Sequence, residues 1–216
     1  MGEGGSDLRR FLTDGSADLS FTPVSFGFNA AIESIAIDGA SIYVGGRFTS
    51  SGNNTAGNYL TKLNSDGSRD QTFTYQTNRT VNEIKPLTNG RVAVLSQASF
   101  GTVSQGVYFL SAAVLVEEQF GSLGSLSWFD FGVDENDHVY APRVGGAMFT
   151  RRNDDGTFDA SFPGFDSLVT TVAIDEANRV WVGGFFSTLG GEPVSRLVIL
   201  NGEPGELAII EDPTLV

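Results

Sequence analysis

The chain has 216 residues and a net charge of −13, from 13 lysine and arginine residues against 26 aspartate and glutamate residues. Its longest basic clusters are Arg9-Arg10 and Arg151-Arg152, and phosphate groups need local neutralisation by basic side chains, so we expect no nucleic-acid partner. The sequence contains no cysteine, which excludes disulfide bonds and thiolate metal sites, and it has no apolar run of about 18 residues, so we expect no membrane insertion.

Glycine and phenylalanine are abundant, with 27 and 17 residues, which is typical of short strands joined by tight turns. The Gly-rich residues 1–7 are expected to form a flexible N-terminus, and residues 8–216 a single domain. Residues 8–22 then predict a hairpin, because the motif DGSADLSF at residues 14–21 places an Asp-Gly turn before a short strand.

This motif returns along the chain. It recurs as DGSRDQTF at residues 66–73 and as DGTFDASF at residues 155–162, and a decayed copy, EEQF, lies at residues 117–120. The final phenylalanines are 52, 47 and 42 residues apart, and periods of about 40 to 50 residues indicate propellers or solenoids. We therefore expect these phenylalanines to be buried at matching places: Phe21, Phe73, Phe120 and Phe162.

A second marker runs out of phase with the first. It is the sequence IYVGGRF at residues 42–48, which returns as VWVGGFF at residues 180–186, with weaker copies at residues 92–94 and 139–141. An apolar run and a few turn residues precede each copy, which predicts a hairpin. Both faces of the marker strands are apolar, as expected for strands covered on both sides. The glycine pairs are expected to permit a bulge or a close backbone approach.

A further strand is predicted after each marker, at residues 59–64, 107–116, 148–152 and 197–201. Each repeat then has four strands, the number in a propeller blade. We therefore predict an all-β fold, a β-propeller of about four four-stranded repeats, spanning residues 14–65, 66–116, 117–154 and 155–210. Because outer hairpins outnumber inner ones, the propeller is either incomplete or closed by the N-terminal hairpin.

The tandem motifs DGSxDxSF and VGGxF resemble the delta-60 repeat family of β-propellers, over residues 8 to 200. Such repeats occur in bacterial surface or secreted proteins and in phage virion proteins. The resemblance therefore implies an extracytoplasmic or virion scaffold and implies no activity. The middle copies depart from the pattern, with VLSQ at residues 94–97 and EEQF at residues 117–120.

The residues that could carry chemistry have structural explanations. The Asx-rich turns at residues 64–70 and 153–159 offer oxygens as calcium loops do, but they lack the closing glutamate, and short acidic side chains also satisfy turn backbones. His138, the only histidine, precedes a marker strand and is expected at a solvated turn. No pair of carboxylates stands out. We therefore predict no catalytic residue, no cofactor and no metal ligand.

Four aromatic residues could stack on sugars if exposed, but we expect them in the core. They are Tyr43, Trp128, Tyr140 and Trp181.

The resemblance, together with the lack of a catalytic constellation, implies a non-catalytic structural or interaction propeller in a phage virion, as a tail component, with other protein subunits as its partners. The alternative is a secreted or cell-surface bacterial propeller that recognises a glycan or a protein. A glycan-active enzyme is the third hypothesis, because fold alone does not fix function. The expected location is the virion or the extracellular surface.

Overall fold

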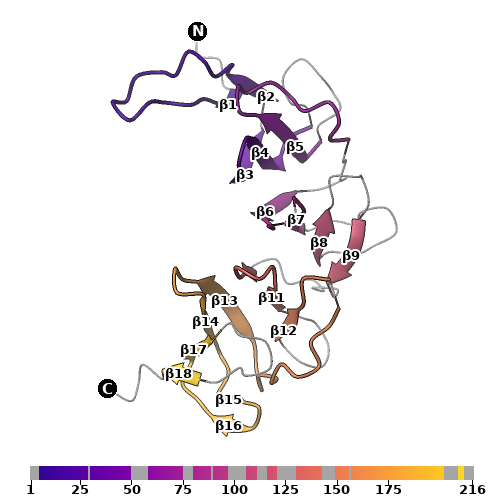
Figure 1. The fold of residues 1–216 in the computed structure, drawn as a ribbon, viewed down its shortest axis with the longest axis vertical. Coiled ribbons are helices and arrows are strands. Elements are labelled where there is room, and N and C mark those ends of the chain that lie inside the picture. The colour runs from indigo at the N-terminus through magenta and orange to yellow at the C-terminus, as the bar shows by residue number, and fades with distance from the viewer. Residues whose placement is uncertain are drawn as a thin grey trace. The chain divides into compact units, whose positions relative to one another are not determined.

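A computed structural model describes residues 5–28, 30–49, 58–74, 80–88, 90–96, 106–110, 116–120, 130–142, 149–155, 157–201 and 209–211. Across these residues the regular secondary structure is β throughout, in small antiparallel sheets, which confirms the predicted fold class (Figure 1). The described part holds no helix that could cross a membrane. The chain divides into two compact units, Met1–Glu117 and Glu118–Val216, and each is described by itself.

The first unit contains two larger sheets, which we call blades 1 and 2. Blade 1 consists of β3 (Ala31–Asp38), β4 (Ser41–Arg47) and β5 (Leu60–Asn64), and a β-bridge between Leu63 and Arg69 marks its fourth strand. Blade 2 consists of four strands in sequence order: β6 (Val81–Pro86), β7 (Val92–Ser96), β8 (Gly106–Leu110) and β9 (Val116–Phe120).

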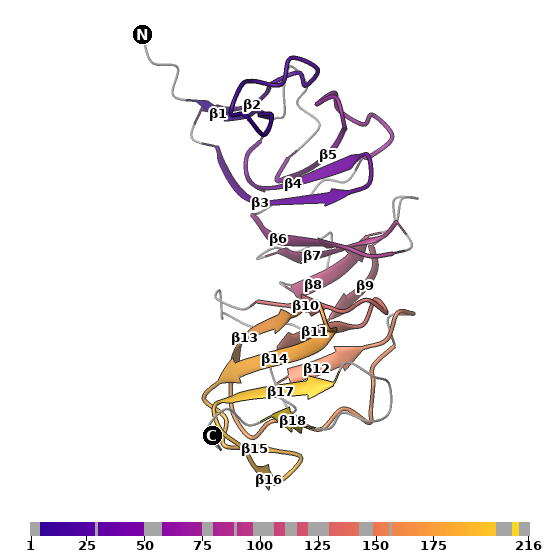
Figure 2. The same cartoon turned by 60° about the vertical axis from the view of Figure 1, so that its left-hand side comes forward.

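The second unit repeats this plan. Blade 3 has β10 (Gly132–Val133), β11 (Val139–Pro142) and β12 (Phe149–Arg152), with a bridge between Arg152 and Phe158 in place of a fourth strand. Blade 4 is formed by β13 (Val169–Ile174), β14 (Arg179–Gly184), β17 (Leu197–Asn201) and β18 (Ile209–Glu211), side by side in Figure 2.

A short hairpin in the second unit was not predicted. It joins β15 (Thr188–Leu189) and β16 (Glu192–Pro193) through Gly190 and Gly191, which both have positive φ. A Gly-Gly pair is a hairpin signal in the sequence, but the flanking strands are too short to show an alternating pattern.

The N-terminal hairpin has the predicted turn. Its β-bridge joins Phe11 and Ala17, at the positions that Leu63 and Arg69 occupy in blade 1. Residues 5–7 of the segment expected to be flexible belong to β1 (Gly5–Leu8), which pairs with β2 (Val24–Phe28). Figure 1 shows the hairpin extending from this two-stranded sheet.

The glycine pairs sit opposite bulges, as predicted. A Cβ on Gly46 would lie 2.1 Å from the carbonyl oxygen of Ala31, and one on Gly184 would lie 2.2 Å from that of Leu168. The strand opposite shifts register at this point in both blades. Blade 2 shifts register in the same way although Ser96 stands in place of the second glycine. The bulge therefore belongs to the repeat, and glycine marks the copies in which the backbones approach most closely.

The final phenylalanine of each repeat motif packs on the next set of strands. Phe21, Phe73 and Phe162 are all buried, as predicted, whereas the side chain of Phe120 lies outside the described residues. Each phenylalanine shares a buried cluster with three residues at equivalent positions of the following blade, which we call its socket. The sockets are Ile42, Val44 and Leu63 for Phe21; Val92, Val94 and Leu110 for Phe73; and Val180, Val182 and Leu200 for Phe162.

The marker strand of blade 1, β4, is apolar on both faces because both faces are covered. In β4, Ile42 and Val44 lie in the cluster with Phe21, whereas Tyr43 between them lies in the cluster with blade 2. Alternate side chains of a strand point to opposite faces. This strand thus connects the packing of two neighbouring interfaces.

Removing a phenylalanine that packs in a socket should destabilise the fold. We expect Phe73→Ala or Phe162→Ala to lower the free energy of unfolding by about 3 to 5 kcal/mol, because each leaves a large cavity between packed sheets. Denaturant unfolding monitored by tryptophan fluorescence measures the change. The control is Phe185→Ala, because Phe185 is 62% exposed and should lose less than about 1 kcal/mol. A loss below about 1 kcal/mol at both test positions would contradict the repeat phasing.

Candidate functional site

The repeat motif folds as two consecutive Asx turns. In each copy the Oδ1 atom of the first aspartate accepts hydrogen bonds from the backbone N–H and the hydroxyl of the residue two positions later. The second aspartate does the same. The pairs are Asp14 with Ser16, Asp18 with Ser20, Asp66 with Ser68, Asp70 with Thr72, Asp155 with Thr157, and Asp159 with Ser161.

These contacts explain why the motif needs aspartate, glycine and a hydroxyl residue. Gly67 has a φ of 83°, a left-handed conformation that glycine adopts without strain. A Cβ there would also lie 2.3 Å from the carbonyl oxygen of Thr22, so the turn is closely packed against the N-terminal hairpin. Within the described residues no three acidic or histidine side chains converge as metal ligands. The metal-free state of the turns stays a prediction.

The second aspartate also pairs with a cation on the preceding strand. Arg10 Nε donates to Asp18 Oδ2 at 2.7 Å, and Arg151 Nε donates to Asp159 Oδ2 at 2.7 Å. In blade 1 the cation at this position is a lysine, and the ion pair joins Lys62 Nζ to Asp70 Oδ2 at 3.2 Å. The Arg151 and Asp159 side chains are only 2% and 10% exposed, so the copy in blade 3 is the most deeply buried of the three.

The hydrogen bonds of the turns lower the pKa of their aspartates. Bonds from the neighbouring serine or threonine are the largest cause at Asp14, Asp18, Asp66 and Asp70. At Asp159 burial raises the pKa, but the bonds from Ser161 and Arg151 outweigh it, and the net pKa is lowered. These carboxylates are therefore held in the charged form as acceptors.

A small cavity lies between the two blades of the first unit. Its volume is about 50 Å³, and its polar side is formed by Tyr43, Lys62, Asp70 and Thr72. A space of this size, with polar groups on one side, can admit water.

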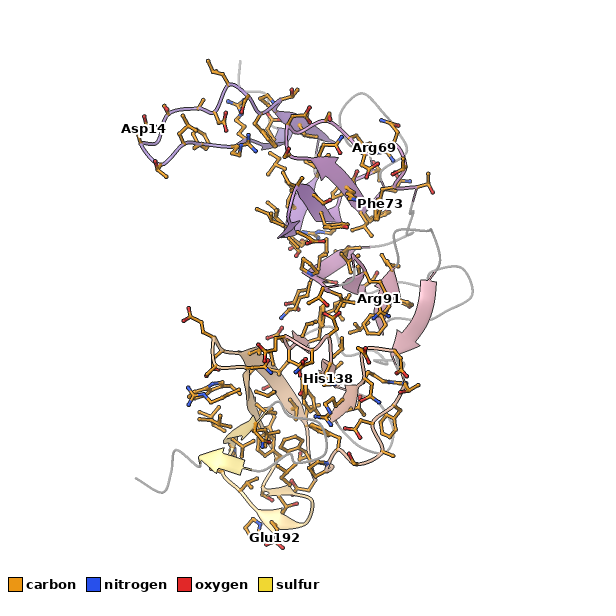
Figure 3. The ribbon with its side chains drawn as sticks, viewed as in Figure 1. Asp14, Arg69, Phe73, Arg91, His138 and Glu192 are labelled. Carbon is orange, nitrogen blue, oxygen red and sulfur yellow. The ribbon has the colours of Figure 1, made fainter. Side chains whose placement is uncertain are left out.

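His138 lies in a buried polar cluster. The Asp134 Oδ1 atom accepts from the backbone N–H of Asn136 and of His138, and its Oδ2 atom contacts His138 Nδ1 at 2.8 Å and Tyr140 Oη at 3.0 Å. His138 is 6% exposed, so the prediction that it lies at a solvated turn is wrong. The imidazole is buried because its Nδ1 atom contacts the buried Asp134 carboxylate. Figure 3 labels its place in the second unit. Burial, with the Asp134 charge, raises the pKa of Tyr140 far above its usual range and keeps the phenol a neutral donor.

The same arrangement recurs in blade 4 without a histidine. Asp175 Oδ1 accepts from the N–H groups of Ala177 and Arg179, and its Oδ2 atom accepts from Arg179 Nε at 2.7 Å and Trp181 Nε1 at 2.9 Å. The Trp181 bond is the largest of the causes that lower the pKa of Asp175. Because arginine replaces histidine in the copy, the Asp134–His138 pair serves to close a hairpin.

This aspartate turn was missed in the sequence, although a signal exists. The spacing Asp-x-x-x-His/Arg-Val-Tyr/Trp occurs at residues 134–140 and again at residues 175–181. Its third residue after the aspartate has a positive φ in both copies, at Asp137 and Asn178. The pattern predicts a hairpin in which one carboxylate binds two backbone donors and two side-chain donors.

The structure separates the aromatic residues that could stack on sugars. Tyr43 and Tyr140 are buried, as predicted. Trp181 is partly exposed, with the Arg179 guanidinium 5.6 Å from the centre of its ring. Trp128 lies outside the described residues. Trp181 is therefore the one of the three described residues that solvent reaches appreciably.

Comparisons with known proteins support the propeller repeat. A family model described as "Domain of unknown function (DUF5122) beta-propeller" matches residues 41–73, which span the marker strand and the Asp-Gly motif of blade 1. No curated protein sequence shows a significant match to the chain.

Two solved structures are similar to the chain at low identity. The computationally designed Ika4 protein is 15% identical, with a TM-score of 0.47, over 76% of this chain and 92% of that one. The extracellular domain of the one-component system BT4673 from B. thetaiotaomicron is 12% identical, with a TM-score of 0.49, over 89% of this chain. This chain spans 27% of that domain, and we draw nothing on function from either likeness.

Breaking the buried ion pair should cost far more than breaking an exposed one. We expect Arg151→Ala to lower the free energy of unfolding by about 3 to 5 kcal/mol, because it leaves the Asp159 charge buried without its partner. Arg47→Ala, which breaks the exposed pair with Glu33, should cost less than about 1 kcal/mol. Arg151→Lys should recover part of the loss, since Lys62 occupies this position in blade 1. Equal losses at Arg151 and Arg47 would contradict the difference in burial.

Asp166 lies outside the repeat motif, and its Oδ1 atom accepts hydrogen bonds from the backbone N–H groups of Ser187 and Thr188, which should make stability depend on acid pH. Hydrogen bonds from Ser187 and Thr188 lower the pKa of Asp166 to about 2, whereas the unfolded value is about 3.9. Its contribution is therefore complete above pH 4 and is lost as the pH falls towards 2. The melting temperature of Asp166→Asn should lie below that of the parent protein at pH 6, and the two should converge near pH 2. A gap of constant size across this range would show that the carboxylate charge is irrelevant.

Proposed function

We propose that this chain is a non-catalytic structural and interaction propeller that serves as a component of a phage tail. The observation that carries the proposal is the use of its ionisable side chains. The buried histidine, the buried arginine and the aspartates of the repeat motifs are engaged in hydrogen bonds that close turns and hairpins. Groups so engaged define the shape of the blades, and their recurrence from blade to blade supports a scaffolding role.

Exposed apolar side chains on the N-terminal hairpin support an interaction role. Phe11, Leu12 and Leu19 are 61%, 50% and 95% exposed. Asp14 lies at the tip of the same hairpin in Figure 3. Apolar side chains gathered on a hairpin that projects from a sheet favour contact with another protein. The resemblance to repeats found in virion proteins supports a tail as the place of that contact.

A secreted or cell-surface propeller that binds a glycan is the second candidate, and the partly exposed Trp181 favours it. Its ring is fixed by the hydrogen bond to Asp175, and a fixed aromatic face can stack on a sugar.

Localisation and glycan binding distinguish the two candidates. Antibodies raised against the chain should label the tails of purified phage particles from the source strain. Labelling of the cell surface or culture fluid alone would favour the second candidate. In that case the chain should bind to a glycan array, and Trp181→Ala should abolish the signal while Phe185→Ala preserves it. Turnover of a bound glycan would contradict the non-catalytic assignment.

A further inference from the structure

Phe11 stands at the position of the third socket residue but is not buried as the socket leucines of the other copies are. The third socket residue is paired across the sheet with the first, and Leu63, Leu110 and Leu200 at this position are all almost completely buried. The bridge from Phe11 to Ala17 matches the bridge from Leu63 to Arg69, so Phe11 stands at the same position of the N-terminal hairpin. It is nevertheless 61% exposed. In blade 3 the position holds Arg152, which lies over the ring of Phe158.

In blade 4 the uncovered face is the one that, in blade 1, packs against the following blade. In blade 1, Ala36 pairs with Tyr43 across β3 and β4, and both residues are buried in the cluster formed with blade 2. In blade 4, Ala173 pairs with Trp181 in the same register. Here Ala173 is exposed and Trp181 is partly exposed. The same residue type, alanine, is thus buried where a following blade covers it and exposed where none of the described residues does.

Leu12, Leu19 and Phe185 are also exposed, but their exposure does not mark a face that lacks a neighbouring blade. Leu12 and Leu19 correspond to Asn64 and Gln71 of blade 1, which stay exposed although the N-terminal hairpin covers that side of the blade. Phe185 corresponds to Arg47, which stays exposed although blade 2 covers the other side. Phe11 and the Ala173–Trp181 pair, by contrast, are more exposed than the corresponding residues of blade 1. So is Leu197, which is 39% exposed, whereas Leu60 at the same register position of blade 1 is buried in the cluster with blade 2.

We propose that the chain associates head to tail with a second copy of itself, the face around Phe11 of one copy packing on the Ala173–Trp181 face of the next. Each copy carries one face of each kind, and the interfaces within the units pair these same two kinds of face. A second copy therefore supplies the matching surface without any other component. The contact is heterologous, so it generates a ring or a filament. This inference rests on the proposed interaction function and names the partner of that function.

The test uses two variants that each disable one face. Light scattering on the full chain, over a range of protein concentrations and at moderate salt to screen the net charge of −13, should give masses above the 23.0 kDa of one copy. Phe11→Glu and Ala173→Glu should each reduce the mass to that of one copy. Because each keeps the face that the other lacks, an equimolar mixture should recover a dimer. Circular dichroism confirms that both variants are folded.

Phe185→Glu is the matched control, because Phe185 corresponds to the exposed Arg47 of blade 1, and it should associate as the parent chain does. The proposal is overturned if the parent chain has the mass of one copy at every concentration, if the mixture stays monomeric, or if the control dissociates the assembly as strongly. A monomer that Phe11→Glu destabilises would place the cover of Phe11 within the same chain, which also overturns it. The localisation experiment is independent of these results, so failure of self-association leaves the proposed tail function standing.

Discussion

The structure depends on the insertion of a phenylalanine into the socket of the following blade. Phe21, Phe73 and Phe162 are planar, rigid side chains, and each meets the first and third residues of a marker strand and one leucine beside them. This contact requires apolar first and third residues on the marker strand, on the face that meets the phenylalanine. It also requires that the strand before the phenylalanine be held at a fixed place, which is the work of the two Asx turns and the ion pair behind them.

The polar groups of the chain serve that placement. One aspartate oxygen binds the turn and the other binds the cation of the preceding strand, so that Arg151 and Asp159 remain buried without an unpaired charge. The inner hairpins are closed in a similar way. One carboxylate interacts with four hydrogen-bonding groups, at Asp134 and again at Asp175. This arrangement contains a histidine in one copy and an arginine in the other. Because the hydrogen-bond pattern is kept while the residue type changes, the arrangement serves to hold the shape of the hairpin.

Repetition made much of the fold readable from the sequence. The spacing of Phe21, Phe73 and Phe162 predicted which aromatic side chains are buried, and the VGG motif predicted the bulges. The burial of His138 was not predictable from its neighbours in the sequence, because it depends on where Asp134 points after the turn has formed. The exposure of Phe11 and Trp181 could not be predicted for another reason. Equivalent positions in a repeat are buried or exposed according to whether a neighbouring blade packs on them.

The phenylalanine contact has a consequence for how the chain folds. Each phenylalanine precedes its own socket in the sequence: Val92 and Leu110 lie 19 and 37 residues after Phe73, and Val180 and Leu200 lie 18 and 38 residues after Phe162. The loops that close each interface are therefore much shorter than the chain, which limits their entropic cost. Contacts that are local in sequence favour rapid folding, and a repeat that touches only its neighbours can dock as soon as the next strands emerge from the ribosome.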